Sequence, residues 1–408
     1  MKSVVLFEDE GHSNLAPLVY WRSVFELKVG RKILLDRTAQ CLGTPITGVW
    51  TRNWLAAVAA QRCGAPANQP VDDGTILVNG RWLTGKTPEF PAGPCVGVAD
   101  GQVAFIVCNS KLASDIGPTD LLDTTRRDMT IAGIEQVEAG GSFVNYPWDI
   151  ISNLDELLVE DWRPTEAGAE SEVDSAVKLE PADQIHIGQS TFIHPTAVID
   201  ASPGPVYISH DVRVGPYAVL EGPLYIGPGS QINPHTWLHG GNSIGPVCKV
   251  GGELDCCVLH SFTNKQHDGF LGHAYVGSWV NIGAGCVNSN LKNTYGKIRV
   301  PINRRDVDSK LQLFGCIIAD HAKIGINATI PTGAVIGMSA TVATSDMIPK
   351  FLPSFAWFTG SGVGLGDPGR LLDAATQMMI RRNIDMTDEE IELFLELPAR
   401  IQASEANR

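Results

Sequence analysis

The stretch 261–273 contains His267, whose side chain is suited to proton transfer, and also Lys265 and a second histidine, His273, which could line a site. An imidazole titrates near neutral pH, so it can accept a proton from an attacking nucleophile under working conditions. Further along, the run 283–285 places Ala284 between two glycines. A backbone N–H at such a corner can stabilise a developing oxyanion. The chain therefore offers a candidate proton acceptor and a candidate amide donor for an oxyanion.

The residues on either side of this stretch repeat with a period of six, which fits neither an amphipathic helix nor an alternating strand. Such a period is typical of a solenoid in which each hexad forms one short strand and points its aliphatic residue at the axis. We predict a prism of about six to seven coils, with three hexads per coil. The aliphatic positions are Ile187, Ile193, Ile199, Ile208, Val214, Leu220, Ile226, Ile232, Leu238, Ile244, Val250, Val276, Ile282, Ile318, Ile324, Ile330, Ile336 and Val342.

The series breaks between Val250 and Val276, which are 26 residues apart and therefore out of phase. We predict that the chain leaves the prism here and that His267 lies on the resulting loop. Loops on a rigid scaffold are common places for binding and catalytic residues. The six-residue spacing of aliphatic residues is lost a second time between Asn290 and Ile318.

Length and charge limit the class of protein. A chain of 408 residues is long enough for two or three domains. A formal net charge of −14 argues against non-specific binding to nucleic acid or anionic membranes, so phosphate-bearing substrates need locally placed cations. The nine cysteines are scattered without a CxxC pair, which indicates reduced thiols in a cytoplasmic setting. No signal peptide is visible, and no run of about eighteen apolar residues predicts a membrane span.

The N-terminal part alternates strand-like and helix-like runs. Strands are expected at 2–7, 75–78 and 103–108, and helices at 54–60 and 112–123. This alternation predicts an α/β domain, with a polar loop at 8–14 after the first strand.

Composition marks the remaining boundaries. From 154 to 184 ten acids face two bases, which predicts a solvated connector. Beyond the repeats we expect two helices, one near 368–382 and one that opens at Thr387, where Glu390 completes a capping box. The predicted organisation is an α/β domain at 1–153, an acidic linker at 154–185, a β-helix at 186–348 and a C-terminal extension with helices at 349–408.

Three runs carry a specific resemblance: TNKQHDGFLGHAYVG around His267, NIGAG at 281–285 and NSNLKNTYG at 288–296. They resemble the hexapeptide-repeat half of the bifunctional N-acetylglucosamine-1-phosphate uridyltransferase and glucosamine-1-phosphate acetyltransferase family, in its alternative bacterial branch with a short N-terminal domain. The resemblance implies a left-handed parallel β-helix, a homotrimer and the substrates acetyl-CoA, a sugar phosphate and a nucleoside triphosphate such as UTP. The implied product is a UDP-N-acetylated sugar such as UDP-N-acetylglucosamine, a precursor of the cell envelope.

The resemblance also implies roles for matching positions. His267 matches the catalytic base, which would deprotonate the amine before it attacks the thioester. The other implied residues are Phe270, Asn281 and Asn290 at the acceptor and Ala284 and Ile326 at acetyl-CoA.

Two positions depart from the family. Where the family has a phosphate-binding arginine and lysine, this chain has Trp237 and Asp255. The phosphate therefore lacks its usual cations. The acceptor-binding cations predicted to replace them are Lys265, Lys292 and Lys297.

In the N-terminal domain, the segment 7–30 resembles the loop of the same branch. Arg22 and Lys28 are its early cations and are the predicted nucleotide-binding residues, although Lys28 can also be a surface residue. Asp9 and Asp149 are the predicted ligands of Mg²⁺, which prefers oxygen ligands and keeps several waters. Glu8 and Asp9 can instead serve to solvate the loop.

Two alternatives remain open. In the first, one domain is degenerate and the chain keeps only the acyltransferase or only the nucleotidyltransferase activity. In the second, the prism is a zinc hydratase of the γ-carbonic anhydrase type, which needs three converging histidines. His235, His239 and His260 are the nearest supply for such a site.

Overall fold

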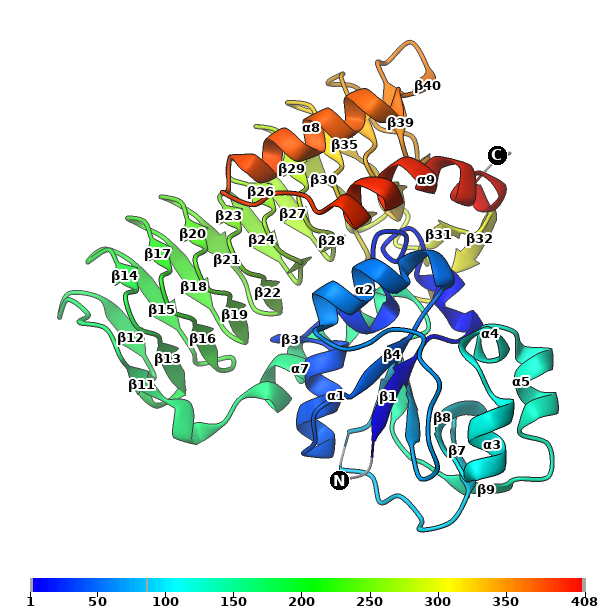
Figure 1. The fold of residues 1–408 in the computed structure, drawn as a ribbon. Helices are drawn as coiled ribbons and strands as arrows, with labels where there is room; N and C mark the ends of the chain where they lie inside the picture. The colour runs from blue at the N-terminus through cyan, green and yellow to red at the C-terminus, as the bar shows by residue number, and fades with distance from the viewer. Residues whose placement is uncertain (1–2, 86, 406–408) are drawn as a thin grey trace. The chain divides into compact units, whose positions relative to one another are not determined.

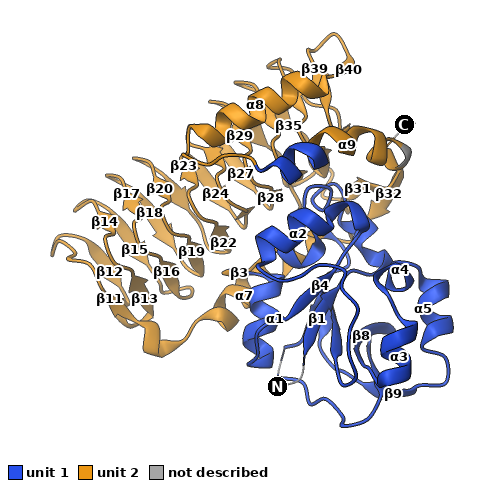
Figure 2. Cartoon of the chain, in the orientation of Figure 1, with its two compact units in different colours: residues 1–27, 32–146, 387–393 blue, residues 28–31, 147–386, 394–408 orange. Residues whose placement is uncertain are grey.

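The computed structural model describes residues 3–85 and 87–405, and the chain forms two compact units (Figure 2). The N-terminal unit comprises Met1–Leu27, Lys32–Tyr146 and Thr387–Leu393. The solenoid unit comprises Lys28–Arg31, Pro147–Met386 and Phe394–Arg408. In the described part of the chain, no helix has the length and apolar character needed to cross a membrane.

The N-terminal unit is built on a six-stranded sheet with the order β4-β1-β5-β8-β7-β9. Strand β1 lies between β4 and β5 and is parallel to both, and its four apolar residues are buried, as expected for a parallel strand covered on both faces. The strands predicted near 2–7, 75–78 and 103–108 are confirmed. The strands are β1 (Val4–Phe7), β4 (Gly48–Trp50), β5 (Ile76–Asn79), β7 (Cys95–Ala99), β8 (Gln102–Val107) and β9 (Glu135–Glu138), with β3 (Lys32–Ile33) and the pair β6 (Trp82–Leu83) and β10 (Ser142–Phe143) outside this sheet.

Helices cover this sheet (Figure 1). The helix-like runs predicted at 54–60 and 112–123 are present with shifted ends. The helices are α1 (Leu34–Leu42), α2 (Ala56–Cys63), α3 (Ser110–Asp115), α4 (Pro118–Leu121) and α5 (Thr124–Thr130). The segment predicted as a polar loop at 8–14 is instead partly a 3₁₀ helix (Glu10–Leu15), whose N-cap Asp9 accepts a hydrogen bond from Gly11 N.

The solenoid unit is a parallel β-helix with three faces, and nearly all of its strands pair in register with the strands one coil away. The first face consists of β11 (Gly168–Ala169), β13 (Ile185–Ile187), β16 (Val206–Ile208), β19 (Leu224–Ile226), β22 (Asn242–Ile244), β25 (Val258–Leu259), β28 (Tyr275–Val276), β33 (Cys316–Ile318), β36 (Ala334–Ile336) and β38 (Phe351–Leu352). The second face consists of β12 (Lys178–Glu180), β15 (Val198–Asp200), β18 (Val219–Glu221), β21 (Trp237–Leu238), β24 (Glu253–Asp255) and β27 (Phe270–Gly272), followed by the pair β30 (Val287–Asn288) and β35 (Thr329–Ile330). The third face consists of β14 (Phe192–Ile193), β17 (Arg213–Val214), β20 (Gln231–Ile232), β23 (Lys249–Val250), β26 (Asn264–Lys265), β29 (Asn281–Ile282), β34 (Lys323–Ile324), β37 (Thr341–Val342), β39 (Ala356–Phe358) and the antiparallel β40 (Val363–Leu365).

Ten strands stack in the first face, so the prediction of about six to seven coils was too low. The aliphatic residues of the six-residue series line the axis and are buried, as predicted. The coils that the prediction did not count lie where the spacing between axial aliphatic residues departs from six. A corner can be one or two residues shorter without interrupting strand pairing.

The predicted excursion between Val250 and Val276 was wrong, since β24 to β28 continue the coils. Leu254, Leu259 and Leu271 occupy axial positions there at irregular spacing. The chain leaves the coils later, between β30 and β33, where β31 (Arg299–Ile302) and β32 (Arg305–Asp308) form an antiparallel hairpin.

The segment predicted as a solvated connector is ordered within the solenoid unit. It contains the whole of α7 (Leu154–Asp161), which follows α6 (Pro147–Ser152), and the strands β11 and β12, which pair with the following coils. This segment forms a coil with few apolar residues, so its acidic composition did not indicate a coil.

The C-terminal helices are α8 (Pro368–Ile380) and α9 (Asp388–Glu405). Figure 1 shows α8 alongside the third face of the solenoid. The predicted capping box is confirmed, because Glu390 N donates to Thr387 Oγ1 and Thr387 N donates to Glu390 Oε2.

Candidate functional site

His267 lies at the corner of the solenoid between the third and second faces, after β26 and before β27. Its side chain is exposed. The corner is anchored from inside, because Lys265 Nζ donates to His267 O at 2.6 Å and to Gly251 O at 3.0 Å.

Lys265 therefore does not bind the acceptor as predicted. It occupies an axial position opposite Val250, is 1% exposed and uses its amine on backbone carbonyls. Burial lowers the pKa of Lys265 to about 8. The physical reason is the phase of the coil, which turns this side chain inward where neighbouring coils carry an aliphatic residue.

The corners of three coils stack along one edge of the solenoid and bring predicted residues together. Gly285 N donates to Asp268 O at 3.2 Å, and Asn327 N donates to Ala284 O at 2.8 Å. His267, Ala284 and Ile326 thus lie on consecutive corners of the same edge. Ile326 is 64% exposed, so it presents apolar surface beside the coil of Ala284.

Phe270 and Asn290 also lie together, on the second face. A Cβ on Gly272 would lie 2.4 Å from the ring of Phe270 and 2.8 Å from Asn290 Nδ2, so both side chains cover this glycine. Asn290 Nδ2 lies 3.0 Å from His273 Nδ1, which is 3.7 Å from Asp255 Oδ2. Burial lowers the pKa of His273 against the opposing charge of Asp255.

Beside this group, α7 and the second face enclose a cavity of about 680 Å³, which we call the acidic cavity. Its charged lining residues are Asp155, Glu156, Glu160, Glu221 and Asp255. Burial and the neighbouring charge of Asp255 raise the pKa of Asp155. Asp255, one of the two positions expected to depart from a phosphate-binding cation, lines this cavity, and the acidic lining disfavours a phosphate here.

Trp237 takes part in the same acidic surroundings. Its indole Nε1 donates to Glu221 Oε1 at 3.0 Å, and its ring lies 4.2 Å from the ring of His239. His239 in turn lies between Glu221 and Glu253.

Asn281 lies elsewhere, on the third face, in a cavity of about 300 Å³ that we call the basic cavity. The charged lining residues are Lys249, Lys323, Arg381 and Arg382, and Asn264, Gln266 and Asn281 supply amides. Sequence reasoning missed this group. The sequence feature that could have indicated this cavity is the pair of adjacent arginines after α8, Arg381 and Arg382.

Lys292 and Lys297 lie in the segment that leaves the coils, where Lys292 Nζ donates to the carbonyl of Lys297. The side chain of Lys297 is exposed. Their predicted contact with an acceptor stays a prediction.

In the N-terminal unit, Glu8 follows β1 and is buried against Arg52, which follows β4. Arg52 Nε and Nη2 donate to its two carboxylate oxygens at 3.0 and 2.9 Å. Thr51 Oγ1 and Val24 N donate to the same carboxylate. Burial alone would raise the pKa of Glu8, but the charge and hydrogen bonds of Arg52 outweigh it and lower the pKa to about 2.

Asp9 forms a second buried pair with Arg81, whose Nε and Nη2 donate to its two oxygens at 2.7 and 2.6 Å. Asn79 Nδ2 also donates to Asp9. Gly11 is needed beside the pair, because a Cβ there would lie 2.3 Å from the guanidinium carbon of Arg81. Burial opposes ionisation, but Arg81 keeps the pKa of Asp9 below its usual value.

Glu8 and Asp9 therefore do not solvate a loop, and Asp9 does not fit the predicted magnesium ligand, since both of its oxygens are held by Arg81. Asp149, the other predicted ligand, lies in α6 of the solenoid unit. Among the described residues, no group of three or more His, Cys, Asp and Glu side chains is arranged to hold a metal ion.

The predicted nucleotide-binding cations differ in position. Arg22 is buried in the N-terminal unit, where its carbonyl accepts a hydrogen bond from Arg52. Lys28, in β2 (Lys28–Val29), is not a surface residue, because it is 3% exposed. Its Nζ donates to Arg31 O and lies 4.3 Å from the ring centre of Tyr225 on the first face. Its amine therefore serves the solenoid unit, which argues against nucleotide binding.

The three histidines of the hydratase alternative have different partners. His235 stacks on Tyr217, and His260 Nδ1 lies 3.1 Å from Ser278 Oγ. With His239 between two glutamates, the three imidazoles do not converge within the described part of the chain.

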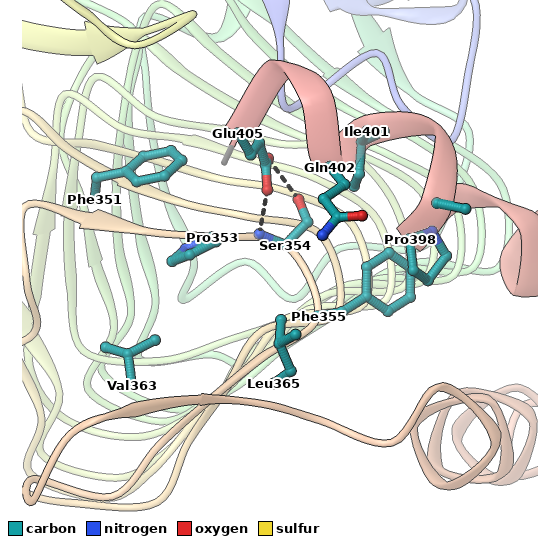
Figure 3. Close-up of a pocket in the computed structure, with 11 residues that line it drawn as sticks. Phe351, Pro353, Ser354, Phe355, Val363, Leu365, Pro398, Ile401, Gln402 and Glu405 are labelled. Atoms are coloured by element: carbon teal, nitrogen blue, oxygen red, sulfur yellow. Dashed lines mark hydrogen bonds between the residues drawn. The ribbon is translucent and has the colours of Figure 1, made fainter. Parts of the chain in front are cut away.

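A further cavity, of about 560 Å³, lies at the end of the solenoid below α9 (Figure 3). Glu405 accepts hydrogen bonds from Ser354 N and Oγ at 2.7 and 2.8 Å. The lining is mostly apolar: Phe351, Pro353, Ser354, Phe355, Val363, Leu365, Pro398, Ala399, Ile401, Gln402 and Glu405. It supplies no cation for a phosphate.

Comparison with known proteins bears on both units. Residues 4–170 match the family model described as sugar nucleotidyl transferase. The matched residues make up less than half of the chain. The chain is also 29% identical over 104 residues to a bifunctional sugar-1-phosphate nucleotidylyltransferase/acetyltransferase of Sulfurisphaera tokodaii, a match that covers 25% of this chain and 26% of the relative.

A second relative is the bifunctional protein GlmU of Acaryochloris marina, 26% identical over 235 residues, or 56% of this chain and 42% of the relative. The two matches thus cover 26% and 42% of the lengths of these relatives. A solved structure named as an acetyltransferase of Bacillus cereus is 17% identical, covers 53% of this chain and 99% of its own, and has a TM-score of 0.17. The predicted resemblance to the bifunctional transferases is confirmed by the two relatives and the family model.

Proposed function

We propose that this protein is a bifunctional transferase. It acetylates the amine of an amino-sugar phosphate with acetyl-CoA and couples the product to a nucleoside triphosphate, UTP in the leading case. The product is then a UDP-N-acetylated sugar such as UDP-N-acetylglucosamine. The observation that carries the proposal is the stacked edge of His267, Ala284 and Ile326 in a chain whose residues 4–170 match the model of the sugar nucleotidyl transferase family.

In the acetyl-transfer half, the amine nitrogen of the acceptor attacks the thioester carbonyl carbon. His267 takes the proton of the amine, and the coenzyme leaves as a thiolate that can recover this proton. The N–H of Ala284, which has no acceptor among the described residues, is available to the oxyanion. Phe270 and Asn290, which cover Gly272 together, would contact the sugar.

The nucleotidyl-transfer half rests on the family of residues 4–170 and on Arg22. The other arginines that follow the strands of the central sheet, Arg52 and Arg81, are held by carboxylates. This observation favours the second candidate function, in which the solenoid acetylates and the N-terminal unit no longer transfers nucleotides. Mg²⁺ belongs only to the bifunctional candidate, because it is proposed for nucleotidyl transfer.

The assembly is part of the proposal. We expect a homotrimer, and we expect it in the cytoplasm. His267 is exposed at a corner of the solenoid, so a neighbouring prism would supply the missing wall of its site. Sedimentation at micromolar concentration checks this. A fully active monomer would rule out the shared site.

One assay tests the proposed function and separates it from the second candidate. Purified protein is incubated with acetyl-CoA, a panel of amino-sugar phosphates and several nucleoside triphosphates, and free thiol and pyrophosphate are followed separately. We expect both products. Thiol release without pyrophosphate would support the single-activity candidate, and neither product with any substrate would contradict both.

A further inference from the structure

The basic cavity concentrates positive charge in a strongly acidic protein. Lys249 comes from β23, Lys323 from β34, and Arg381 and Arg382 follow the last turn of α8. The formal net charge of the chain is −14, yet the described residues that line this cavity include no acid. Such a gathering of cations costs electrostatic free energy unless an anion joins it.

The cations have few partners that would neutralise them. Arg382 Nη2 donates to Asn264 Oδ1 at 2.6 Å, but its buried Nε has no hydrogen-bond partner in the described part of the chain. A buried donor left without an acceptor is destabilising unless a ligand supplies one. Among the described residues, Lys323 Nζ donates to two backbone carbonyls, those of Trp279 and His321.

The two lysines that line the cavity both have lowered pKa values. Burial and then the charges of Arg382 and Arg381 lower the pKa of Lys249. Burial lowers the pKa of Lys323 to about 7. An anion in the cavity would favour the protonated form of both amines.

We propose that the basic cavity binds a phosphate ester of one of the two substrates of acetyl transfer, with Lys249, Arg381 and Arg382 as its ligands. This inference rests on the proposed acetyl transfer for the identity of the substrate. Planar guanidinium groups suit phosphate because they can donate two parallel hydrogen bonds. Asn281 and Gln266 provide amides at the same cavity for neighbouring hydroxyl groups.

The cavity is close in the chain to the residues of the stacked edge. Gln266 immediately precedes His267, and Asn281 lies three residues before Ala284. A phosphate held on the third face would therefore lie on the coils whose next corners carry His267 and Ala284.

Two molecules could bring this phosphate: an amino-sugar phosphate or coenzyme A. The first experiment measures binding by calorimetry to the full chain, with inorganic phosphate, glucosamine 1-phosphate and coenzyme A as separate probes. The variants are Lys249→Gln and Arg382→Gln, and the control is Arg370→Gln, an exposed arginine on α8 that does not line the cavity. Lys249 has no side-chain hydrogen bond within 3–85 and 87–405, so its variant should fold even if Arg382→Gln does not.

We expect at least one phosphate ester to bind about 10- to 100-fold more weakly to each cavity variant, the range for losing a hydrogen bond to a charged group. Binding to Arg370→Gln should match the parent. Equal affinities in the parent and in folded Lys249→Gln would overturn the inference. Weakened binding of inorganic phosphate alone would also overturn it, because the site would then hold an adventitious ion only.

Steady-state kinetics then identify the source. A raised KM for the sugar phosphate assigns the cavity to the acceptor, and a raised KM for acetyl-CoA assigns it to the coenzyme. If no acetyl transfer occurs but both esters lose binding in the variants, the phosphate site stands and the proposed function fails. If acetyl transfer occurs with unchanged KM values in both variants, the proposed function stands and the cavity assignment fails.

Discussion

The central sheet of the N-terminal unit and the third face of the solenoid both gather cations, but they use them differently. Arg52 and Arg81 are each held by two hydrogen bonds to a buried carboxylate, at distances between 2.6 and 3.0 Å. In the basic cavity, the described lining contains no acid, and Arg382 keeps an unpaired buried Nε. The number of cations in a region therefore does not measure its capacity for phosphate.

The difference assigns separate tasks to the two regions. A paired arginine in the N-terminal unit fixes the segments after β1 and β4, and removing it leaves a buried carboxylate without compensation. A cation on the third face without a carboxylate partner does not stabilise the fold and remains available to a ligand. Mutations should thus affect stability in the first region and binding in the second.

The largest effect is expected for His267→Ala. Loss of a positioned proton acceptor should lower the rate of acetyl transfer by about 10² to 10⁴, while pyrophosphate release from an already acetylated sugar phosphate stays at the parental rate. Stopped-flow or steady-state thiol detection measures the first, and a coupled pyrophosphate assay the second. His194→Ala, at a corner that also follows the third face, is the control and should leave both rates unchanged. Parental acetyl transfer by His267→Ala would show that another group is the base.

The next effect concerns the buried pair of Glu8 and Arg52. Arg52→Met should lower the free energy of unfolding of the N-terminal unit by about 3–5 kcal/mol, because Glu8 is left buried and unpaired. Chemical unfolding followed by circular dichroism measures this loss. Adding Glu8→Gln should recover part of it, since the uncompensated charge is gone. Lys249→Gln, in contrast, should leave unfolding within experimental error, and a loss as large as that of Arg52→Met would break the comparison.

Lys265→Met tests a cation that is paired with carbonyls. The pKa of Lys265 is about 8 in the folded protein and 10.5 in the reference state, so the unfolded chain binds more protons between these values. The free energy of unfolding should therefore rise with pH over this window, by about 3 kcal/mol for this one group. Urea unfolding from pH 8 to pH 10.5 should show a smaller rise in Lys265→Met than in the parent. The exposed Lys111→Met is the control, and identical slopes in all three proteins would contradict an inward Lys265.

The smallest effect is expected on the acidic side of the solenoid. Asp255 raises the pKa of His273 against burial, so Asp255→Asn should lower this pKa further. Titration of the imidazole signals by NMR measures the shift. Asp211→Asn, next to His210, serves as a control that should leave His273 unchanged. Phosphate binding should be the same in Asp255→Asn as in the parent, and stronger binding there would move the phosphate to the second face.

Much of the fold follows from local pattern. The six-residue series predicted the axial residues because each hexad repeats the same strand and corner, so one coil specifies the next. The run of four apolar residues at Val4–Phe7 predicted a buried strand, and Thr387 with Glu390 predicted a helix start. These features depend on residues a few positions apart, and the sequence contains that information directly.

The candidate site was predicted only in part. The motif resemblance named Phe270 and Asn290, which the structure brings together, but it also grouped them with Asn281, which lines the basic cavity on another face. A motif orders residues along the chain, while a three-sided coil distributes them over different faces. A change of one residue in a corner decides which face a side chain joins.

What the sequence alone determined is the repeating architecture and the α/β character of the first unit. Only the tertiary structure decided which charges are free. Lys265 turns inward because its coil keeps phase with Val250, and Arg382 reaches Asn264 across 118 positions of the chain. Pairing and burial over such separations depend on the stacking of coils and the docking of α8, and no short pattern in the sequence encodes them.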